Sequence, residues 1–202
     1  MATTQKTSFA ITLFLLIGAA LLPLKALATD YAPVSVEMPL KQVSERVYYV
    51  QGLPGMATDF EGFISNAGFV ITKQGVVVID TLGSPSLAWK LRQRIREVTD
   101  QPVVKVIMTH YHADHIYGLQ VFQDEGAEII APKGIYEYLQ SPSAKERLEE
   151  RRFSLDPWVN EQTRLVEPDR IVEASETLTL GEVEFKISYL GSAHSTGDLS
   201  VY

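Results

Sequence analysis

The sequence predicts an α/β fold, in which at least one helix packs on a β-sheet. Two β-branched apolar runs, Val76–Ile79 and Val103–Thr109, are typical of buried strands. Between them, Leu87 and Leu91 belong to a series of apolar residues at helical spacing. A chain of 202 residues with an ordinary globular composition indicates one domain.

Residues 1–28 have the pattern of a secretory signal peptide. Lys6 precedes the apolar run Phe9–Leu24, and Ala26-Leu27-Ala28 matches a small-residue cleavage site. The alternative is a membrane anchor, but the run is shorter than the roughly 20 residues that a spanning helix needs. We therefore expect cleavage without a stable anchor, which leaves a domain over residues 29–202 in the periplasm or outside the cell.

Charge and cysteine content limit the classes of partner and compartment. The whole chain has a net charge of -7 and no cysteine. Removing residues 1–28 would take away two of the 18 basic residues and none of the 25 acidic ones. This acidic balance argues against nucleic acid, whose phosphates need clustered basic side chains. An exported chain without disulfides must rely on its core and on metal for stability.

The first half of the mature chain reads as strands around one amphipathic helix. A short strand is predicted at 34–36, and longer ones at 47–50, 63–71 and 76–79. Ser84 is the expected N-cap of the helix, with Pro85 at its first position. The basic residues of this helix are interpreted as a solvated face.

The second half alternates helices and strands before ending in strands. A short helix is predicted at 116–124, a strand at 128–131, and charged helices over 133–153 with a break at Pro142. An irregular connection covers 154–169. Strands at 171–172, 177–180 and 183–189 are expected to form an antiparallel meander, followed by a strand at 199–202.

The most informative stretch is Thr109–His115, which reads H-x-H-x-D-H and holds three of the four histidines. Side chains alternate in an extended chain, so His110 and His112 point the same way and can reach one ion. With His194 added, from a segment rich in Gly, Ser and Thr, one ion would have three nitrogen ligands. Three nitrogens and an open position are typical of a catalytic zinc site, whereas four protein ligands close a structural one.

A role outside a defined metal site is disfavoured for these histidines. Surface or capping positions do not fit, because three of them follow a hydrophobic strand in this pattern. A His-rich tract that binds metal opportunistically does not fit either, because such tracts lie in polar low-complexity sequence.

The motif resembles the signature of the metallo-β-lactamase superfamily. Asp80, after the strand Val76–Ile79, matches that family's first motif, and His194 matches the third. The resemblance runs from about Val47 to the end of the chain. It implies an αβ/βα sandwich and a metal-dependent hydrolase, with one or two Zn²⁺ ions and iron less expected.

The resemblance also assigns metal ligands. His110, His112 and His194 would hold one ion, and Asp114 with His115 would serve a second. Asp114 would also orient the attacking water and handle its proton, which makes it the expected catalytic residue. The reaction implied is attack of a metal-activated hydroxide on an ester, thioester or amide carbonyl of a small molecule, β-lactams included.

Three further residues have supporting roles with an alternative for each. Asp80 is expected to accept the free N–H of a ligating histidine, the alternative being a cap on the following helix. In the family the loop at 52–62 leans over the metal site, so Met56 and Phe60 are candidate substrate contacts. The alternative is an ordinary hairpin loop with a part-buried aromatic, and neither interpretation is preferred.

Within the superfamily, segments 66–72 and 80–84 look most like the exported sulfur-oxidation and quinoprotein-relay zinc hydrolases. Exported β-lactamases remain an alternative. Glyoxalase II is disfavoured because its substrate is cytoplasmic, and flavodiiron enzymes are disfavoured because they usually carry Glu at the position of His112. An iron-dependent persulfide dioxygenase and a non-catalytic exported metal-binding protein are the two alternatives. The sequence identifies neither the substrate nor the oligomeric state.

The family's bridging Asp and final His normally lie further along than His194, and no histidine follows it here. We therefore expect the 202 residues to be a fragment that lacks the C-terminal strands and the last metal ligands. Expressed alone, this fragment is expected to be poorly folded and inactive.

Overall fold

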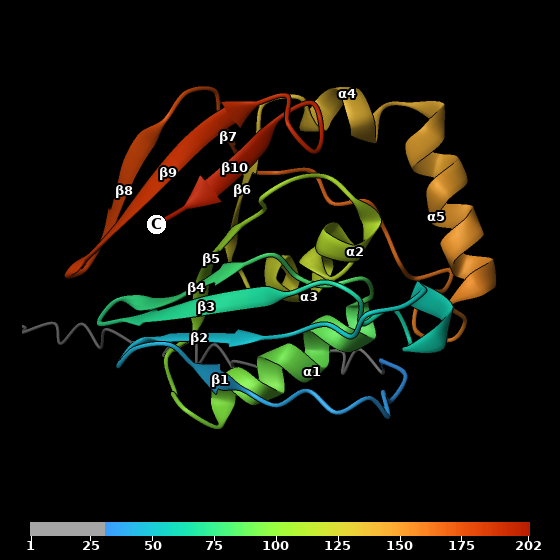
Figure 1. Cartoon of the computed structure of the whole chain (residues 1–202), viewed down its shortest axis with the longest axis horizontal. Helices are drawn as coiled ribbons and strands as arrows, with labels where there is room; N and C mark the ends of the chain where they lie inside the picture. The colour runs from blue at the N-terminus through green and yellow to red at the C-terminus, as the bar shows by residue number, and fades with distance from the viewer. Residues whose placement is uncertain (1–30) are drawn as a thin grey trace, which may run out of the picture. The chain divides into compact units, whose positions relative to one another are not determined.

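The computed structural model describes residues 31–202 (Figure 1). The expected signal peptide lies outside the described residues. Seven strands form the larger sheet: β1 (Lys41–Gln42), β2 (Val47–Val50), β3 (Ala67–Thr72), β4 (Gly75–Ile79), β5 (Val103–Ile107), β6 (Glu128–Pro132) and β7 (Arg170–Val172). Three form the smaller sheet: β8 (Glu176–Leu180), β9 (Val183–Gly191) and β10 (Asp198–Val201). The helices are α1 (Pro85–Arg96), α2 (Ala113–Ile116), α3 (Leu119–Asp124), α4 (Ile135–Leu139) and α5 (Pro142–Ser154), with a 3₁₀ turn η1 at Ala57–Asp59.

The relative direction of neighbouring strands in the larger sheet changes at β4. Its strands follow chain order from β1 to β7, antiparallel up to β4 and parallel from β4 to β7. Parallel neighbours need a crossover, and helices supply each one: α1 joins β4 to β5, α2 and α3 join β5 to β6, and α4 and α5 join β6 to β7. This arrangement confirms the α/β class.

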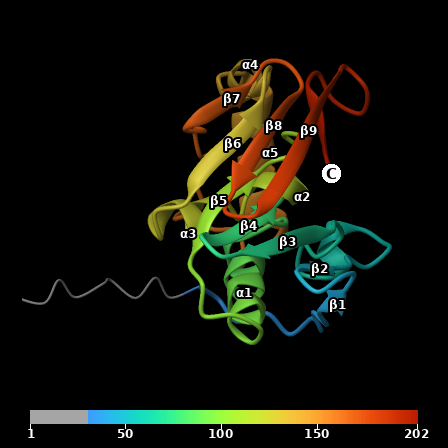
Figure 2. The same ribbon diagram turned by 90° about the vertical axis from the view of Figure 1, so that its left-hand side faces the viewer.

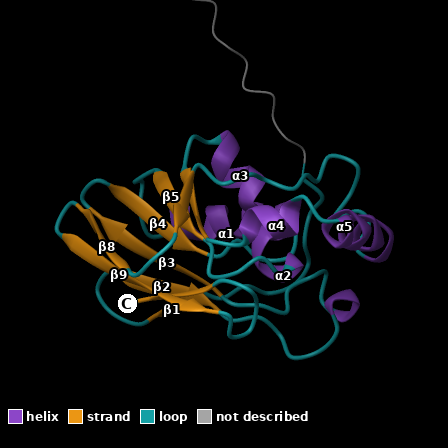
Figure 3. Cartoon of the chain, turned by 90° about the horizontal axis from the view of Figure 1, so that it is seen from above, coloured by secondary structure: helices purple, strands orange, loops and turns teal. Residues whose placement is uncertain are grey.

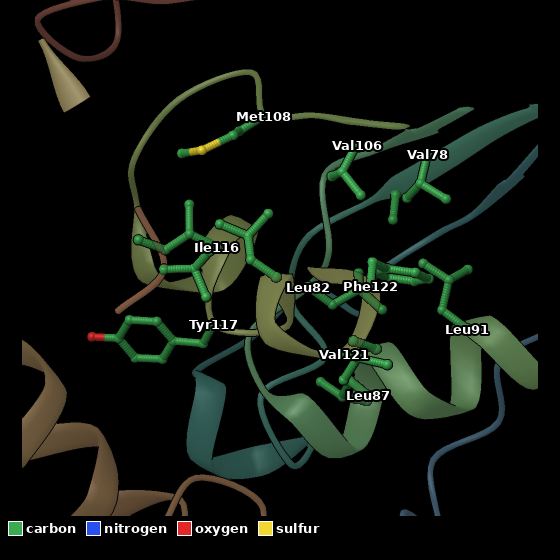
Figure 4. Close-up of a cluster of buried hydrophobic side chains, with 14 of the residues drawn as sticks. Val78, Leu82, Leu87, Leu91, Val106, Met108, Ile116, Tyr117, Val121 and Phe122 are labelled. Carbon is green, nitrogen blue, oxygen red and sulfur yellow. The ribbon is translucent and has the colours of Figure 1, made fainter. Parts of the chain in front are cut away.

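Helices α1 and α3 cover one face of the larger sheet. Leu87 and Leu91 of α1 pack with Phe122 of α3 below Val78 and Val106 of the central strands (Figure 4). Helix α1 begins where the sequence predicts, because the Oγ of its N-cap serine accepts the backbone N–H of the third helical residue at 3.1 Å.

The smaller sheet covers the opposite face. Because alternate residues of a strand point to opposite sides, Val77 and Ile107 face away from α1 and pack against Phe185, Ile187 and Leu199. Helix α1 lies below β2–β4 and strands β8 and β9 lie above them (Figures 1 and 2). Seen from above, the strands and helices occupy separate regions, with α5 on the side away from β8 and β9 (Figure 3).

Several element boundaries differ from the prediction. The segment at 34–36 is not a strand, because the carboxylate of Glu61 accepts the N–H of Ser35 at 2.8 Å and so replaces a strand partner. Strand β3 begins at Ala67 instead of Phe63, because left-handed backbone at Glu61 and Gly62 turns the chain just before it. The helix predicted at 116–124 is two short helices, α2 and α3.

The expected meander is wrong in one strand. Strand β7 pairs in parallel with β6, Ala131 opposite Ile171, and so belongs to the larger sheet. Only β8, β9 and β10 form antiparallel pairs in the smaller sheet. No helix within residues 31–202 has the length and apolar content to span a bilayer.

Candidate metal centre

The H-x-H-x-D-H motif begins in the loop that follows β5 and ends in α2, which holds Asp114 and His115. Two backbone hydrogen bonds hold the start of this loop. The N–H of Met108 donates to Ile130 of β6 at 2.9 Å, and Thr109 accepts from Leu199 of β10 at 2.8 Å. The loop is therefore tied to both sheets before its first histidine.

The structure brings His110, His112 and His194 together. One ring nitrogen from each lies within 4.8 Å of those of the other two. His112 Nδ1 and His194 Nε2 are 2.9 Å apart although 82 residues separate them. His194 reaches this position from the bend between β9 and β10.

Hydrogen bonding leaves one nitrogen of His110 free. The Oγ1 of Thr109 donates its only proton to Asp80 at 2.7 Å, so it accepts from His110 Nδ1 at 2.9 Å. His110 Nε2 then carries a lone pair, and this atom is buried without a hydrogen-bond partner. An unpartnered buried lone pair beside two imidazoles suits a bound cation.

Burial also keeps His110 neutral. Loss of solvent, followed by the nearby His115, lowers the pKa of His110 to about 4. Burial and then His194 lower the pKa of His112 in the same direction. Metal ligands must be deprotonated, so both rings are in the correct form near neutral pH.

His115 and Asp114 lie beside the three-histidine group. His115 Nδ1 donates to Asp80 Oδ2 at 2.8 Å, and its Nε2 lies 3.4 Å from Asp114 Oδ2. Burial opposes protonation of His115, but the hydrogen bond and the charge of Asp80 outweigh it and raise the pKa. The rings of His115 and His110 have centroids 4.1 Å apart, so this pair borders the first group.

Asp80 organises the loop from the end of β4. It accepts the N–H and the hydroxyl of Thr109 and the ring N–H of His115. The helix that follows is capped by Ser84, so the capping alternative for Asp80 does not apply. A carboxylate in this position fixes the tautomer and orientation of a ligating imidazole.

Sequence reasoning gave no role to Asp198, which holds the loop of His194. Its buried carboxylate accepts the N–H groups of Ala193 at 3.1 Å and Ser195 at 2.9 Å, the N–H of His194, and the hydroxyl of Ser195 at 2.6 Å. Burial alone would raise the pKa of Asp198, but these hydrogen bonds lower it. The sequence does indicate this role in one way: Asp198 lies in a Gly/Ser/Thr segment just before a strand, and this pattern is typical of turns that a side chain stabilises.

Met56 and Phe60 are not among the residues that line the cleft beside the histidines. Met56 is 68% exposed at the start of η1, and Phe60 packs against the main hydrophobic core. A cleft of about 650 Å³ adjoins His112 and Asp114, and neither loop residue lines it.

Comparisons with known proteins identify the family. The family model described as the metallo-beta-lactamase superfamily matches residues 61–202. The metallo-beta-lactamase IND-1 of Chryseobacterium indologenes is 23% identical over 140 residues, which are 69% of this chain and 50% of that protein. A linear primary-alkylsulfatase of a Pseudomonas strain is 33% identical over 52 residues, which are 26% of this chain and 10% of that protein.

The fold has relatives among solved structures. A metallo-beta-lactamase from Pontibacter korlensis superposes with a TM-score of 0.60 at 20% identity, covering 82% of this chain and 66% of that one. The chain spans about half the length of the curated β-lactamase relative. The match over residues 61–202 includes all four histidines, and the chain belongs to the metallo-β-lactamase superfamily.

Proposed function

We propose that the protein is an exported, zinc-dependent hydrolase that acts on an ester, thioester or amide carbonyl of a small molecule, β-lactams included. The observation that carries the proposal is the buried, unpartnered Nε2 of His110 beside the nitrogens of His112 and His194. Relatives named as β-lactamases and an alkylsulfatase support hydrolysis of small molecules.

The donor set fits zinc. His110, His112 and His194 would hold one ion, and His115 with Asp114 would contribute to a second. Neutral imidazole and carboxylate are ligands suited to Zn²⁺. When bound, zinc acts as a Lewis acid and brings the pKa of a water ligand to roughly 7.

Asp80 and Asp114 would orient the site and accept a proton during the reaction. Asp80 holds the His115 ring so that its Nε2 faces the Asp114 carboxylate. Asp114 is 32% exposed in its side chain and borders the cleft, so it can accept a proton from a nucleophilic water there. The cleft gives a small molecule access to this carboxylate.

Export is part of the proposal and rests on the sequence pattern of residues 1–28. N-terminal sequencing of protein recovered from a periplasmic fraction would test it. A mature protein that begins at residue 29 is expected, and an intact Met1 in the cytoplasm would refute it.

The enzymatic proposal is tested by metal content together with turnover. Plasma emission of the purified protein should find zinc, and a panel of ester, thioester and β-lactam substrates should reveal a hydrolysed class. Asp114→Ala should abolish turnover while the three-histidine site keeps metal. Full rate with full metal content in this variant would refute the role of Asp114. Iron with oxygen uptake on a persulfide would favour a dioxygenase, and zinc without turnover a binding protein.

A further inference from the structure

The cleft beside the candidate metal centre has a second wall that the proposed reaction does not use. His112 and Asp114 line this cleft together with Arg147 and Arg151 of α5. Arg151 of α5 also lines a small neighbouring pocket together with Ala113 and Asp114 of α2, and Figure 1 shows where the two helices lie in the fold. A small molecule bound beside Asp114 in this cleft would therefore also contact α5.

The two arginines of this wall share one carboxylate. They are four residues apart and so lie on the same face of α5. Arg147 reaches Glu150 Oε2 at 3.3 Å and Arg151 reaches Glu150 Oε1 at 3.5 Å. One carboxylate does not neutralise two guanidinium groups, each with five N–H donors, so the pair can accept a further anion.

The next arginine along the helix behaves differently. Arg152 forms an ion pair with Glu149 at 2.6 Å, and its remaining donors bond the carbonyl oxygens of Asn160 at 3.1 Å and Thr163 at 2.7 Å. Arg152 thus anchors the chain that follows α5. Arg147 and Arg151 form no such backbone bonds within the described residues.

Two tyrosines of the cleft stack on each other. The rings of Tyr111 and Tyr138 are 4.5 Å apart and inclined by 15°, and both line the cleft. Burial raises the pKa of Tyr138, so its hydroxyl stays neutral and adds no competing negative charge. Among the described residues that line the cleft, Glu137 is the one acid besides Asp114, so it partly offsets the arginines.

We propose that the substrate carries an oxyanion, such as a carboxylate, which Arg147 and Arg151 bind while its scissile carbonyl lies near Asp114. The exposed edges of the stacked Tyr111 and Tyr138 rings would contact the body of the substrate. This inference rests on the proposed function, because it names the class of molecule that the same site accepts.

Equilibrium binding tests the anion site without requiring turnover. Calorimetric titration of the metal-loaded protein with benzoate and with neutral benzamide should give a Kd at least fivefold lower for benzoate. Roughly one exposed charge-assisted hydrogen bond accounts for a difference of this size. The double variant R147Q/R151Q should remove this preference. K145Q, which removes one positive charge from an exposed position on α5 outside the cleft, should keep the preference.

Two outcomes would overturn the inference: equal binding of benzoate and benzamide, or a benzoate preference that survives in R147Q/R151Q because the anion binds the metal directly. If the double variant does not fold, R147Q alone serves, since the Arg147 side chain is 54% exposed. That single variant should reduce the preference at least twofold, and no reduction would refute the proposal.

Turnover separates this inference from the proposed function. For a pair of hydrolysable esters that differ only in a distal carboxylate or carboxamide, kcat/KM should favour the carboxylate, and R147Q/R151Q should reduce that ratio at least fivefold. Arginine-dependent benzoate binding without hydrolysis of any substrate would refute the hydrolase and leave the anion site standing. Hydrolysis with a ratio unchanged by R147Q/R151Q would refute the anion site alone.

Discussion

Replacing Asp80 with asparagine tests the hydrogen-bond network beneath the histidines. Asp80 has a left-handed backbone, with φ of 60°, which asparagine adopts readily, so the change preserves shape and backbone. The carboxylate accepts the N–H of Thr109 at 2.7 Å, its hydroxyl at 2.7 Å and the ring N–H of His115 at 2.8 Å. An amide has one oxygen, so its NH₂ group must face either the N–H of Thr109 or the two donors at Oδ2, and both orientations lose the negative charge.

The structure sets the size of the effect. Asp80 is 5% exposed, so water cannot replace the lost acceptor. Each hydrogen bond to a charged group contributes about 1.5–3 kcal/mol, and the Thr109 hydroxyl can rotate to recover part of its share. We expect the free energy of unfolding to fall by about 2–4 kcal/mol, which lowers Tm by roughly 5–15 °C in a domain of this size. Zinc affinity should fall about 10- to 100-fold, because the bond that fixes the tautomer of His115 is broken or loses its charge.

Urea unfolding of the metal-free protein and zinc titration against a competing chelator would measure the two effects. Asp100→Asn, an exposed position after α1, is the matched control and should leave both quantities unchanged. If Asp80→Asn retained both stability and zinc affinity within error of the control, the inferred role of this network would be wrong.

Further substitutions give smaller or more selective effects. Asp198→Ala should weaken zinc binding about 10-fold by releasing the loop of His194, as loss of outer hydrogen bonds to ligands does; an unchanged chelator titration would contradict this. The pKa of His110 is about 4 in the folded chain against an ordinary 6.5, so the unfolded state binds more protons between these values. The free energy of unfolding of the metal-free protein should therefore fall as pH drops from 6.5 to 4, and His110→Gln should flatten that fall in urea titrations at each pH. The raised pKa of His115 acts oppositely, its contribution being lost as pH rises through the folded value, so the difference between wild type and His110→Gln is the quantity to compare. Ser84→Ala should cost about 1 kcal/mol through loss of the α1 cap, and a thermal melt unchanged within 1 °C (roughly a third of a kcal/mol) would contradict the assignment.

Local patterns predicted the elements around the site. The β-branched runs of β4 and β5 and the helical spacing of α1 are properties of neighbouring residues, so they can be read without knowledge of tertiary contacts. The grouping of His110 with His112 followed from alternation in extended chain. Their approach to His194 came from the resemblance to a family, because no local rule relates residues 82 positions apart.

The misplaced elements depend on long-range contacts. The three residues of β7 look the same whether they pair with β6 or with β8, and only the sheet decides. The segment at 34–36 has strand-like residues, but Glu61 takes its N–H groups. The role of Asp198 depends on four donors converging on one carboxylate, which a linear sequence does not display.

The backbone bond from Leu199 to Thr109 has a consequence for how the protein assembles. It joins β10 of the smaller sheet to the loop that follows β5 of the larger sheet. His194 therefore reaches His110 and His112 only after the two sheets have packed together. A cation would then bind late in folding, because its ligands come from segments far apart in the chain. Zinc uptake during refolding would therefore report the packing of the two sheets. Removal of the ion should weaken the packing between the two sheets before it affects other parts of the fold. Amide hydrogen exchange should then be faster at β10 than at β5.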